Sequence, residues 1–152
     1  MDKTPRNVWG GYYLTSDRYL LWAHVGKKQN PELKDYKVWC FNGEPKLVLV
    51  CTDRFSSTGL KEDFFDCEWN HLDCQRTQHK LSESKISKPA ILTDMLKQAA
   101  KLSAGLPFSR IDFYQVDGQL KFGEITFFPS SGFQGFVPEK YDTIIGDWLA
   151  LK

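Results

Sequence analysis

Long apolar runs are absent from this 152-residue sequence. The longest ones, such as LVLVC at 47–51, have the length of a strand, whereas a membrane-spanning helix needs about 20 apolar residues. The chain also opens MDKTPRNV, without the basic and then apolar segments of a secretory signal peptide. These absences predict a soluble, cytoplasmic protein.

An excess of charge of either sign is also missing. Lys and Arg together number 20 and Asp and Glu 19, which gives a formal net charge of +1. Charges of both signs are interspersed along the chain, so composition gives no electrostatic reason to expect an anionic polymer or lipid surface. We therefore expect neither nucleic acid nor a membrane as a partner.

Cysteine is scarce, with four residues and no C-x-x-C pair. Cys40 and Cys51 lie in apolar, strand-like runs, which favours buried free thiols over a disulfide framework. One group of residues offers the ligand types that zinc accepts: Cys67, His71, Cys74 and His79. Their order and spacing match no zinc-finger pattern, so we favour a loop with incidental His and Cys and keep zinc as the alternative.

The sequence does contain enough apolar material for one core, because 41% of its residues are hydrophobic. No internal repeat is evident. Residues 1–33 are rich in Tyr and Trp, and alternation around TSD at 15–17 suggests two short strands before a polar linker. We treat them as an atypical N-terminal segment. Residues 34–152 are expected to form the main domain.

Two strand-like runs open that domain. DYKVWCF at 35–41 and PKLVLVCT at 45–52 are rich in β-branched and aromatic residues, and Asn42-Gly43 between them is a strong hairpin signal. A further hairpin is expected at 110–127, around Asp117-Gly118.

Two helices complete the expected architecture. The first is predicted from Pro89, with Ser87 as its cap, to Gly105, and the second begins near Pro138. Strand pairs and helices that stand in separate blocks are typical of an α+β fold. We expect a largely antiparallel sheet with the helices packed on one face.

The predicted hairpin carries charged residues where packing alone would favour leucine or valine. Side chains alternate along a strand, so Arg110 and Asp112 share one face of their strand, and Glu124 and Thr126 share one face of the return strand. Whether the two pairs lie on the same face of the sheet depends on the length of the loop between the strands.

The two loop lengths give opposite results. A two-residue Asp117-Gly118 turn would point Glu124 away from Asp112. A three-residue loop, 116–118, with Gly118 in a G1 bulge would pair Arg110 with Glu124 and Asp112 with Phe122. It also leaves a consistent core face of Ile111, Phe113, Ile125 and Phe127. We therefore predict the three-residue loop.

Two carboxylates brought together in this way need a positive charge between them. Arg110 alone meets that need in a purely structural ion-pair network. The functional alternative is a Mg²⁺ site, in which carboxylates supply hard oxygen ligands, phosphate and water supply the rest, and the arginine contacts the phosphate.

Several ordered motifs resemble a known family. Arg110-Ile-Asp112, a glycine turn and then GEITFFPSSGF at 123–133 resemble the end of an ATP-grasp catalytic core. The closer resemblance is to the TupA-like ATP-grasp family, linked to teichuronopeptide and other cell-surface polysaccharide biosynthesis. The further motifs that carry it are DYKVWCFNGEPK (35–46), DRF (53–55), FFDCEW (64–69) and PEKYDTIIGD (138–147).

The resemblance implies ATP and Mg²⁺ as cofactors and assigns roles residue by residue. Asp112, Glu124 and Thr126 would be metal ligands, although general ATP-grasp enzymes have Asn where Thr126 stands. Arg110 would be catalytic, stabilising charge on the transferred phosphoryl group. Ser130 also departs from the Pro-Gly turn of general ATP-grasp enzymes.

The remaining implied contacts lie nearer the start of the domain. Asp35 would hold the ribose, and Lys37 and Arg54 would contact phosphate or acyl phosphate as catalytic and cofactor-binding residues. Each has a plainer interpretation. Asp35 and Lys37 fit the solvated face of an edge strand, and Arg54 fits an ordinary surface pair with Asp53.

The implied function is Mg²⁺-ATP-dependent ligation of a carboxylate to an amine, on small-molecule or polysaccharide-linked substrates. Residues 1–33 are too few for the upstream nucleotide-binding lobe of ATP-grasp proteins, so the sequence suggests a truncated family member. A protein partner would then supply the missing lobe. The alternative is a non-catalytic remnant that binds nucleotide or associates with glycosyltransferases.

Overall fold

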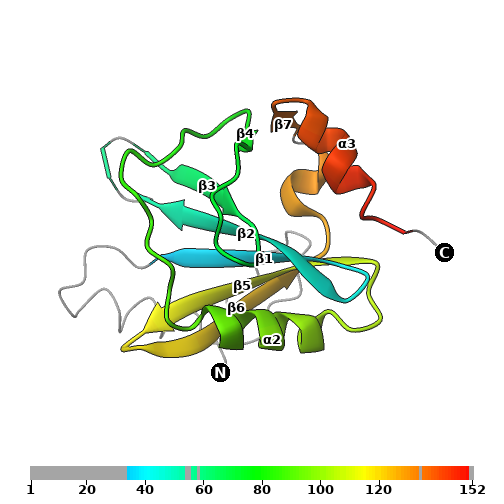
Figure 1. Cartoon of the computed structure of the whole chain (residues 1–152), viewed down its shortest axis with the longest axis horizontal. Helices are drawn as coiled ribbons and strands as arrows, with labels where there is room; N and C mark the ends of the chain where they lie inside the picture. Colours follow the sequence, from blue (N-terminus) through cyan, green and yellow to red (C-terminus); the bar gives the residue numbers. More distant parts are fainter. Residues whose placement is uncertain (1–33, 54–55, 58, 134, 151–152) are drawn as a thin grey trace, which may run out of the picture.

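The computed structural model describes residues 34–53, 56–57, 59–133 and 135–150. Its centre is a five-stranded antiparallel sheet in the order β3-β2-β1-β5-β6 (Figure 1). The strands are β1 (Asp35–Phe41), β2 (Glu44–Thr52), β3 (Lys61–Phe65), β5 (Phe108–Val116) and β6 (Gln119–Thr126). A short pair, β4 (Gln75–Arg76) with β7 (Phe136–Val137), stands apart from this sheet. The predicted α+β class and antiparallel sheet are confirmed.

The β1–β2 hairpin forms where the sequence predicts it. Asn42 and Gly43 both have positive φ, 52° and 83°. Positive φ at both central residues is the type I′ geometry, whose twist matches that of the flanking strands. Asn and Gly are the residues that adopt it at least cost, so local chemistry sets this turn.

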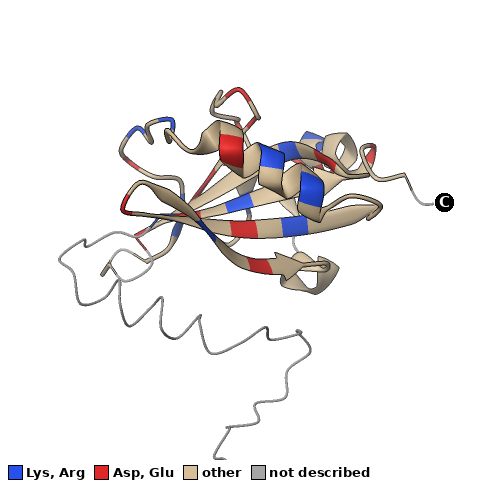
Figure 2. Ribbon diagram, turned by 90° about the horizontal axis from the view of Figure 1, so that it is seen from below, with Lys and Arg blue, Asp and Glu red and all other residues tan. Residues whose placement is uncertain are grey.

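One face of the sheet packs against α2 (Leu92–Leu102). The helix buries Leu92, Met95 and Ala99, which recur at helical spacing. They contact an apolar layer supplied by β1, β2, β3 and β5: Tyr36, Val38, Cys40, Val48, Val50, Phe65, Ile111 and Phe113. Strict alternation along the strands produces this layer, because each of these residues is one of an i, i+2 series. Charged residues of both signs also lie on the helix and on the strands (Figure 2).

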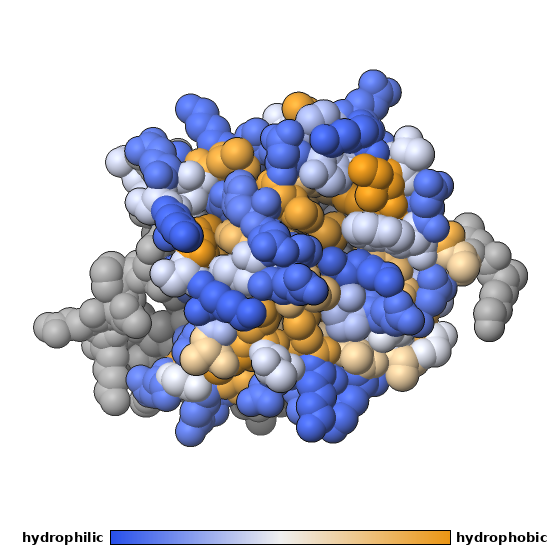
Figure 3. Space-filling model, in the orientation of Figure 1, coloured by the Kyte–Doolittle hydropathy of each residue, from blue (hydrophilic) through white to orange (hydrophobic). Residues whose placement is uncertain are grey.

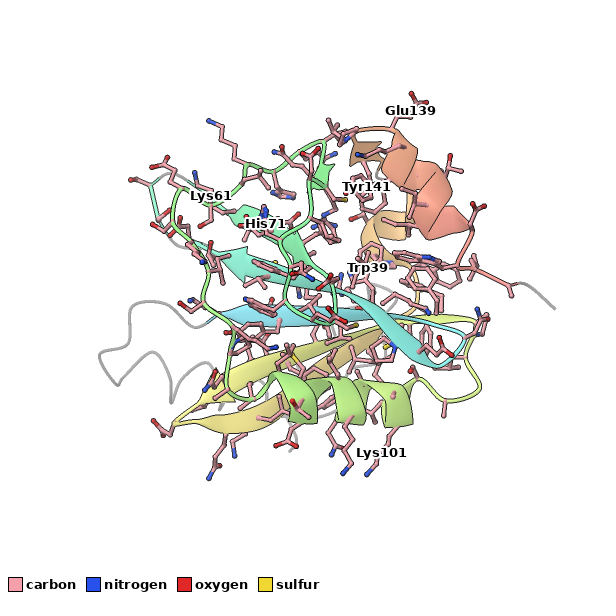
Figure 4. All side chains as sticks on the ribbon, viewed as in Figure 1. Trp39, Lys61, His71, Lys101, Glu139 and Tyr141 are labelled. Atoms are coloured by element: carbon pink, nitrogen blue, oxygen red, sulfur yellow. The ribbon has the colours of Figure 1, made fainter. Side chains whose placement is uncertain are left out.

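The opposite face packs against the C-terminal part of the chain. Here α3 (Lys140–Gly146) buries Ile145, while Tyr141 and Trp148 pack against Trp39, Phe41 and Phe64. Figure 4 shows Trp39 on the side of the sheet where α3 and Tyr141 lie. The prediction that the helices share one face is therefore wrong. Each helix covers a different face, because both faces of the central strands are apolar and each needs a cover.

The first helix begins later than predicted. Pro89 lies in a turn whose carbonyl accepts from Leu92 N, and α2 itself starts at Leu92 without a side-chain cap, so Ser87 is not its cap. The second helix, α3, starts at Lys140, close to Pro138 as predicted. In the described part of the chain, no helix is long and apolar enough to cross a bilayer.

The β5–β6 hairpin departs from the prediction in an informative way. Val116 pairs with Gln119, so the turn is the two-residue Asp117-Gly118 type, with positive φ at both residues. The register then shifts between Ile111 and Phe113, so that Arg110 pairs with Thr126. The predicted three-residue loop is wrong, and a β-bulge inside the ladder supplies the extra residue instead.

The bulge lies at Gly123 and Glu124, which together stand opposite Asp112. A Cβ atom at Gly123 would lie 2.9 Å from both the Asp112 carbonyl oxygen and Cε2 of Tyr114. Only glycine allows this close approach of backbone and ring. Gly123 therefore fixes where the register changes, and with it the face on which Glu124 lies. Phe122 correspondingly packs near Phe113, with ring centroids 6.4 Å apart, and not beside Asp112 as predicted.

We predict that Gly123→Ala lowers the free energy of unfolding by about 1–3 kcal/mol, because the added methyl forces backbone and ring to shift. Gly146→Ala is the matched control, since nothing lies within 4 Å of its added Cβ. Chemical denaturation of both variants measures the effect. Equal stability of the two variants would contradict the role given to Gly123.

Candidate functional site

The candidate site is a row of charged side chains on the face of the sheet that α3 partly covers. Lys37 on β1 stands directly opposite Asp112 on β5, and Trp39 stands opposite Arg110. Cross-strand partners have Cβ atoms about 5 Å apart, so the register alone brings these side chains into contact. The bulge adds Glu124 and Thr126 from β6 to the same face.

Asp112 is the centre of this row and is only 1% exposed. Arg110 donates two hydrogen bonds to it, from Nε to Oδ1 at 2.7 Å and from Nη2 to Oδ2 at 2.8 Å. Lys37 Nζ also donates to Oδ2 and lies 2.8 Å from Asp35 Oδ2. A bidentate guanidinium and a second ammonium make Asp112 a fully ion-paired carboxylate.

Glu124 is linked to Asp112 through the same arginine. Arg110 Nη2 donates to Glu124 Oε1 at 3.1 Å, and Thr126 Oγ1 lies 3.4 Å from that oxygen. The Glu124 side chain keeps 34% of its surface exposed, against 1% for Asp112. One carboxylate of the site is therefore buried and the other opens to solvent.

The row holds three carboxylates, from Asp35, Asp112 and Glu124, against the two cations Lys37 and Arg110. Burial by itself lowers the pKa of Lys37, but attraction to Asp112 and Asp35 outweighs it and raises that pKa. Burial opposes the charge on Arg110 in the same way, and Asp112 and Glu124 raise its pKa. Both side chains are thus held as cations.

This donor set fits a magnesium ion by its chemistry. Two carboxylates and a hydroxyl are hard oxygen ligands, and Mg²⁺ in proteins commonly takes one or two carboxylates with water and phosphate completing its shell. In the described residues, no group of three or more His, Cys, Asp and Glu side chains is arranged to hold a metal. The oxygens of Asp112 and Glu124 converge instead on one atom, Nη2 of Arg110. The guanidinium therefore occupies the position between the two acids.

The structure thus brings together six of the predicted site residues: Asp35, Lys37, Arg110, Asp112, Glu124 and Thr126. The plainer interpretation of Asp35 and Lys37 as an exposed edge is wrong, because β1 is the central strand and they are 3% and 8% exposed. Arg54 lies outside the described residues.

A second ion pair, which was not predicted from the sequence, lies on this face. Arg76 donates from Nε to Glu62 Oε2 at 2.6 Å and from Nη2 to Oε1, and its Nη1 donates to Ser130 Oγ at 3.1 Å. Glu62 is 1% exposed. Alternation in KEDFF puts Glu62 on the same face as Phe64, which is a signal for a buried acid that needs a cation. Nothing in the local sequence of Arg76 identifies it as that cation.

The four zinc-type residues lie in different environments, and His79 Nε2 is 3.9 Å from Glu62 Oε1. Cys67 Sγ lies 3.2 Å from the Pro45 carbonyl oxygen, and His71 Nε2 lies 2.9 Å from Asp63 Oδ1. Cys74 is 1% exposed, and burial raises its thiol pKa to about 12. These contacts give the four residues structural environments of different kinds.

The FFDCEW motif at 64–69 is also structural in its contacts. Asp66 Oδ1 accepts from the backbone N of Glu68 and Asn70, which closes a tight turn. Trp69 stacks on Phe65, with centroids 4.4 Å apart, and donates from Nε1 to the Ile86 carbonyl. Through Trp69 this motif anchors the connector that leads toward α2.

The raised pKa of Lys37 predicts a stability that depends on pH. A cation whose pKa is raised on folding stabilises the protein below its unfolded pKa, near the ordinary 10.5, and loses that contribution as pH rises through the folded value. The difference in unfolding free energy between wild type and Lys37→Met should therefore shrink above about pH 10.5. Denaturation at pH 8 to 11 measures it, and a difference that grows with pH would contradict the ion-pair assignment.

Comparison with known proteins supplies the family. The model of the family described as TupA-like ATPgrasp matches residues 15–150. Its match begins inside the segment 1–33 and extends over the charged row to the end of α3. No curated protein and no solved structure gave a match. Since the matched range covers most of the chain, the protein belongs to the TupA-like ATP-grasp family.

Proposed function

We propose that the chain is an ATP-grasp ligase that uses Mg²⁺ and ATP to join a carboxylate to an amine, in cell-surface polysaccharide or teichuronopeptide biosynthesis. The supporting observation is the convergence of Lys37, Arg110, Asp112, Glu124 and Thr126 on one sheet face. Burial of these charges costs free energy, so their concentration at one place supports a functional role. Family membership supports nucleotide use, and the pathway follows from the resemblance of the motifs.

The protein's own groups would act mainly by position and charge. Arg110, held as a cation, reaches anionic oxygens on either side of it and would contact the phosphoryl group in transfer. Lys37 would neutralise a second phosphate, and Asp35, 2.8 Å from its ammonium, would bind the ribose. Arg54 is proposed as a further phosphate contact. Asp112 orients both cations, because each donates to it.

The proposed reaction has two steps. A carboxylate oxygen of the substrate attacks the γ-phosphorus, and the bond to the β-phosphate oxygen breaks to release ADP and leave an acyl phosphate. An amine then attacks the acyl carbon, the bond to phosphate breaks, and the amine proton passes to solvent. Positioning and charge neutralisation supply most of the catalysis in phosphoryl transfer.

Asp112, Glu124 and Thr126 would hold the magnesium ion. When bound, it neutralises charge on the nucleotide phosphates. Because Arg110 lies between the two acids, the guanidinium has to turn away from them toward an anion before both oxygens are available. Phosphate is such an anion. We therefore expect the ion and the nucleotide to bind together, and Mg²⁺ alone to bind weakly.

A second candidate function follows from the same contacts. Both oxygens of Asp112 are already paired with Arg110 and Lys37, which is also what a purely structural ion network would show. A non-catalytic member of the family, binding nucleotide weakly or associating with a glycosyltransferase or a lobe-supplying protein, would keep this network. Nucleotide titration separates the two candidates.

We predict that the chain binds Mg²⁺-ATP in calorimetric titration and that Glu124→Gln weakens this binding about tenfold or more, because a carboxylate ligand is lost. The difference in ATP affinity between the wild type and Glu124→Gln should nearly vanish when EDTA replaces Mg²⁺. The half-exposed position of Glu124 makes this variant compatible with folding, whereas Asp112→Asn leaves two buried cations short of a partner and should unfold the chain more easily.

Glu44→Gln is the matched control. Glu44 also pairs with a lysine, Lys46, at 2.8 Å, but on the exposed β1–β2 hairpin, and its side chain is 70% exposed. The Glu44→Gln variant should bind Mg²⁺-ATP as tightly as the wild type does. Absence of heat at millimolar nucleotide would favour the non-catalytic candidate, and equal binding by Glu124→Gln and wild type would remove Glu124 from the metal site.

A further inference from the structure

A cavity of about 500 Å³ lies beside the charged row. Aromatic and other apolar residues from the sheet, the β6–β7 connection and the C-terminal segment form most of its wall, including Trp39, Phe108, Phe127, Phe128 and Phe136. Its volume is within the range of small-molecule sites, which are mostly apolar with a few polar groups. Apolar residues also reach the surface elsewhere on the molecule (Figure 3).

The cavity adjoins the candidate site through the register of the sheet. Trp39, in the cavity wall, is the cross-strand partner of Arg110. Phe127 and Phe128 directly follow Thr126, the last residue of β6. A ligand that fills the cavity would therefore have its end within reach of the Arg110 side of the row.

Charge in the cavity wall is already neutralised. Arg76 lines the cavity, but its guanidinium is paired with the buried Glu62 and hydrogen-bonded to Ser130. A second charged group brought against it would lose water without gaining a full partner. The wall therefore favours an uncharged, apolar body.

The wall also holds a buried donor that lacks an acceptor. Trp39 is 7% exposed, and its indole Nε1 has no hydrogen-bond partner among the described residues. Less than 1 Å² of this nitrogen is exposed, so a ligand oxygen reaches it only after the indole ring turns. Arg110, the cross-strand partner of Trp39, favours an anionic oxygen at the end of the ligand.

The connection that forms the far wall is in an uncommon conformation. Ser130, Ser131 and Gly132 all have positive φ, at 51°, 56° and 77°. Two consecutive non-glycine residues in the left-handed region carry strain, which concentrates at ligand-binding sites. The turn places Ser130 against Arg76 and leaves Phe128 80% exposed at the rim.

We propose that this cavity binds the apolar body of the substrate carboxylate, with the carboxylate end directed toward Arg110. The inference that the ligand ends in a carboxylate rests on the proposed ligase function, whereas the inference that the cavity prefers an apolar body does not. The substrate class is thus a monocarboxylate carrying an aromatic ring or a comparable apolar group, rather than one with a second charge.

The test compares three probes on the full chain by ligand-observed NMR, without nucleotide: phenylacetate, acetate and glutamate. We expect phenylacetate to bind at least about tenfold more tightly than the other two, because only it can bury a ring. Equal affinities, or no binding of phenylacetate up to about 10 mM, would overturn the proposal.

Two exposed phenylalanines of the same connection give a matched pair of variants. Phe128→Ala removes an 80% exposed ring at the cavity rim and should weaken phenylacetate binding about fivefold. Phe133→Ala removes a 93% exposed ring that is not part of the cavity wall. This variant should leave phenylacetate binding unchanged. A larger loss in Phe133→Ala than in Phe128→Ala would place the probe elsewhere and overturn the proposal.

The same samples are then titrated with Mg²⁺-ATP, which keeps the two proposals apart. Phenylacetate binding without nucleotide binding supports the cavity and contradicts the ligase. Nucleotide binding without the phenylacetate preference contradicts the cavity and leaves the ligase intact.

Discussion

The arrangement of the charged row depends on one close approach, that of the Gly123 backbone to the Asp112 carbonyl and the Tyr114 ring. The two-residue turn at Asp117-Gly118 sets a register in which Glu124 would face away from Asp112. The bulge at Gly123 reverses that relation within the last residues of β6. Ile125 beyond it can then pack against the core while the acid lies on the other face. Phe127, predicted for the core face, is instead 46% exposed. The absence of a side chain at Gly123 thus determines that Glu124 is part of the site.

The second constraint is the burial of opposite charges in the middle of a sheet. Taking ions out of water costs several kcal/mol each, so a buried carboxylate such as Asp112 persists only with close partners. Arg110 and Lys37 supply them at hydrogen-bonding distance. Such a network contributes little net stability compared with an apolar core, and for this reason its presence beside apolar residues such as Trp39 and Phe41 is informative about function. Glu62 and Arg76 repeat the arrangement at the opposite side of the same face.

Much of this could be predicted from the sequence, where local chemistry determines the outcome. Asn42-Gly43 fixes its hairpin, and the alternation of β1 and β5 predicts which residues share a face. The clustering of Arg110, Asp112 and Glu124 was predicted correctly but for the wrong reason. One extra residue brings Glu124 to the face of Asp112 whether it lies in the turn, as predicted, or inside the β5–β6 ladder, as observed. Contacts between distant segments could not be predicted. The pairing of Glu62 with Arg76, and the covering of opposite faces by α2 and α3, depend on tertiary packing that no local pattern encodes.

The left-handed turn at Ser130, Ser131 and Gly132 restricts how the adjoining cavity can vary. Valine, isoleucine and threonine are poorly tolerated at positive φ, so residues 130 and 131 are confined to a narrow set of small or amide side chains. Phe128 and Leu149 have no such backbone restriction and are 80% and 37% exposed. Substitutions are therefore better tolerated at Phe128 and Leu149 than in the turn. A change of side chain at these two positions can alter ligand selectivity without disturbing the fold.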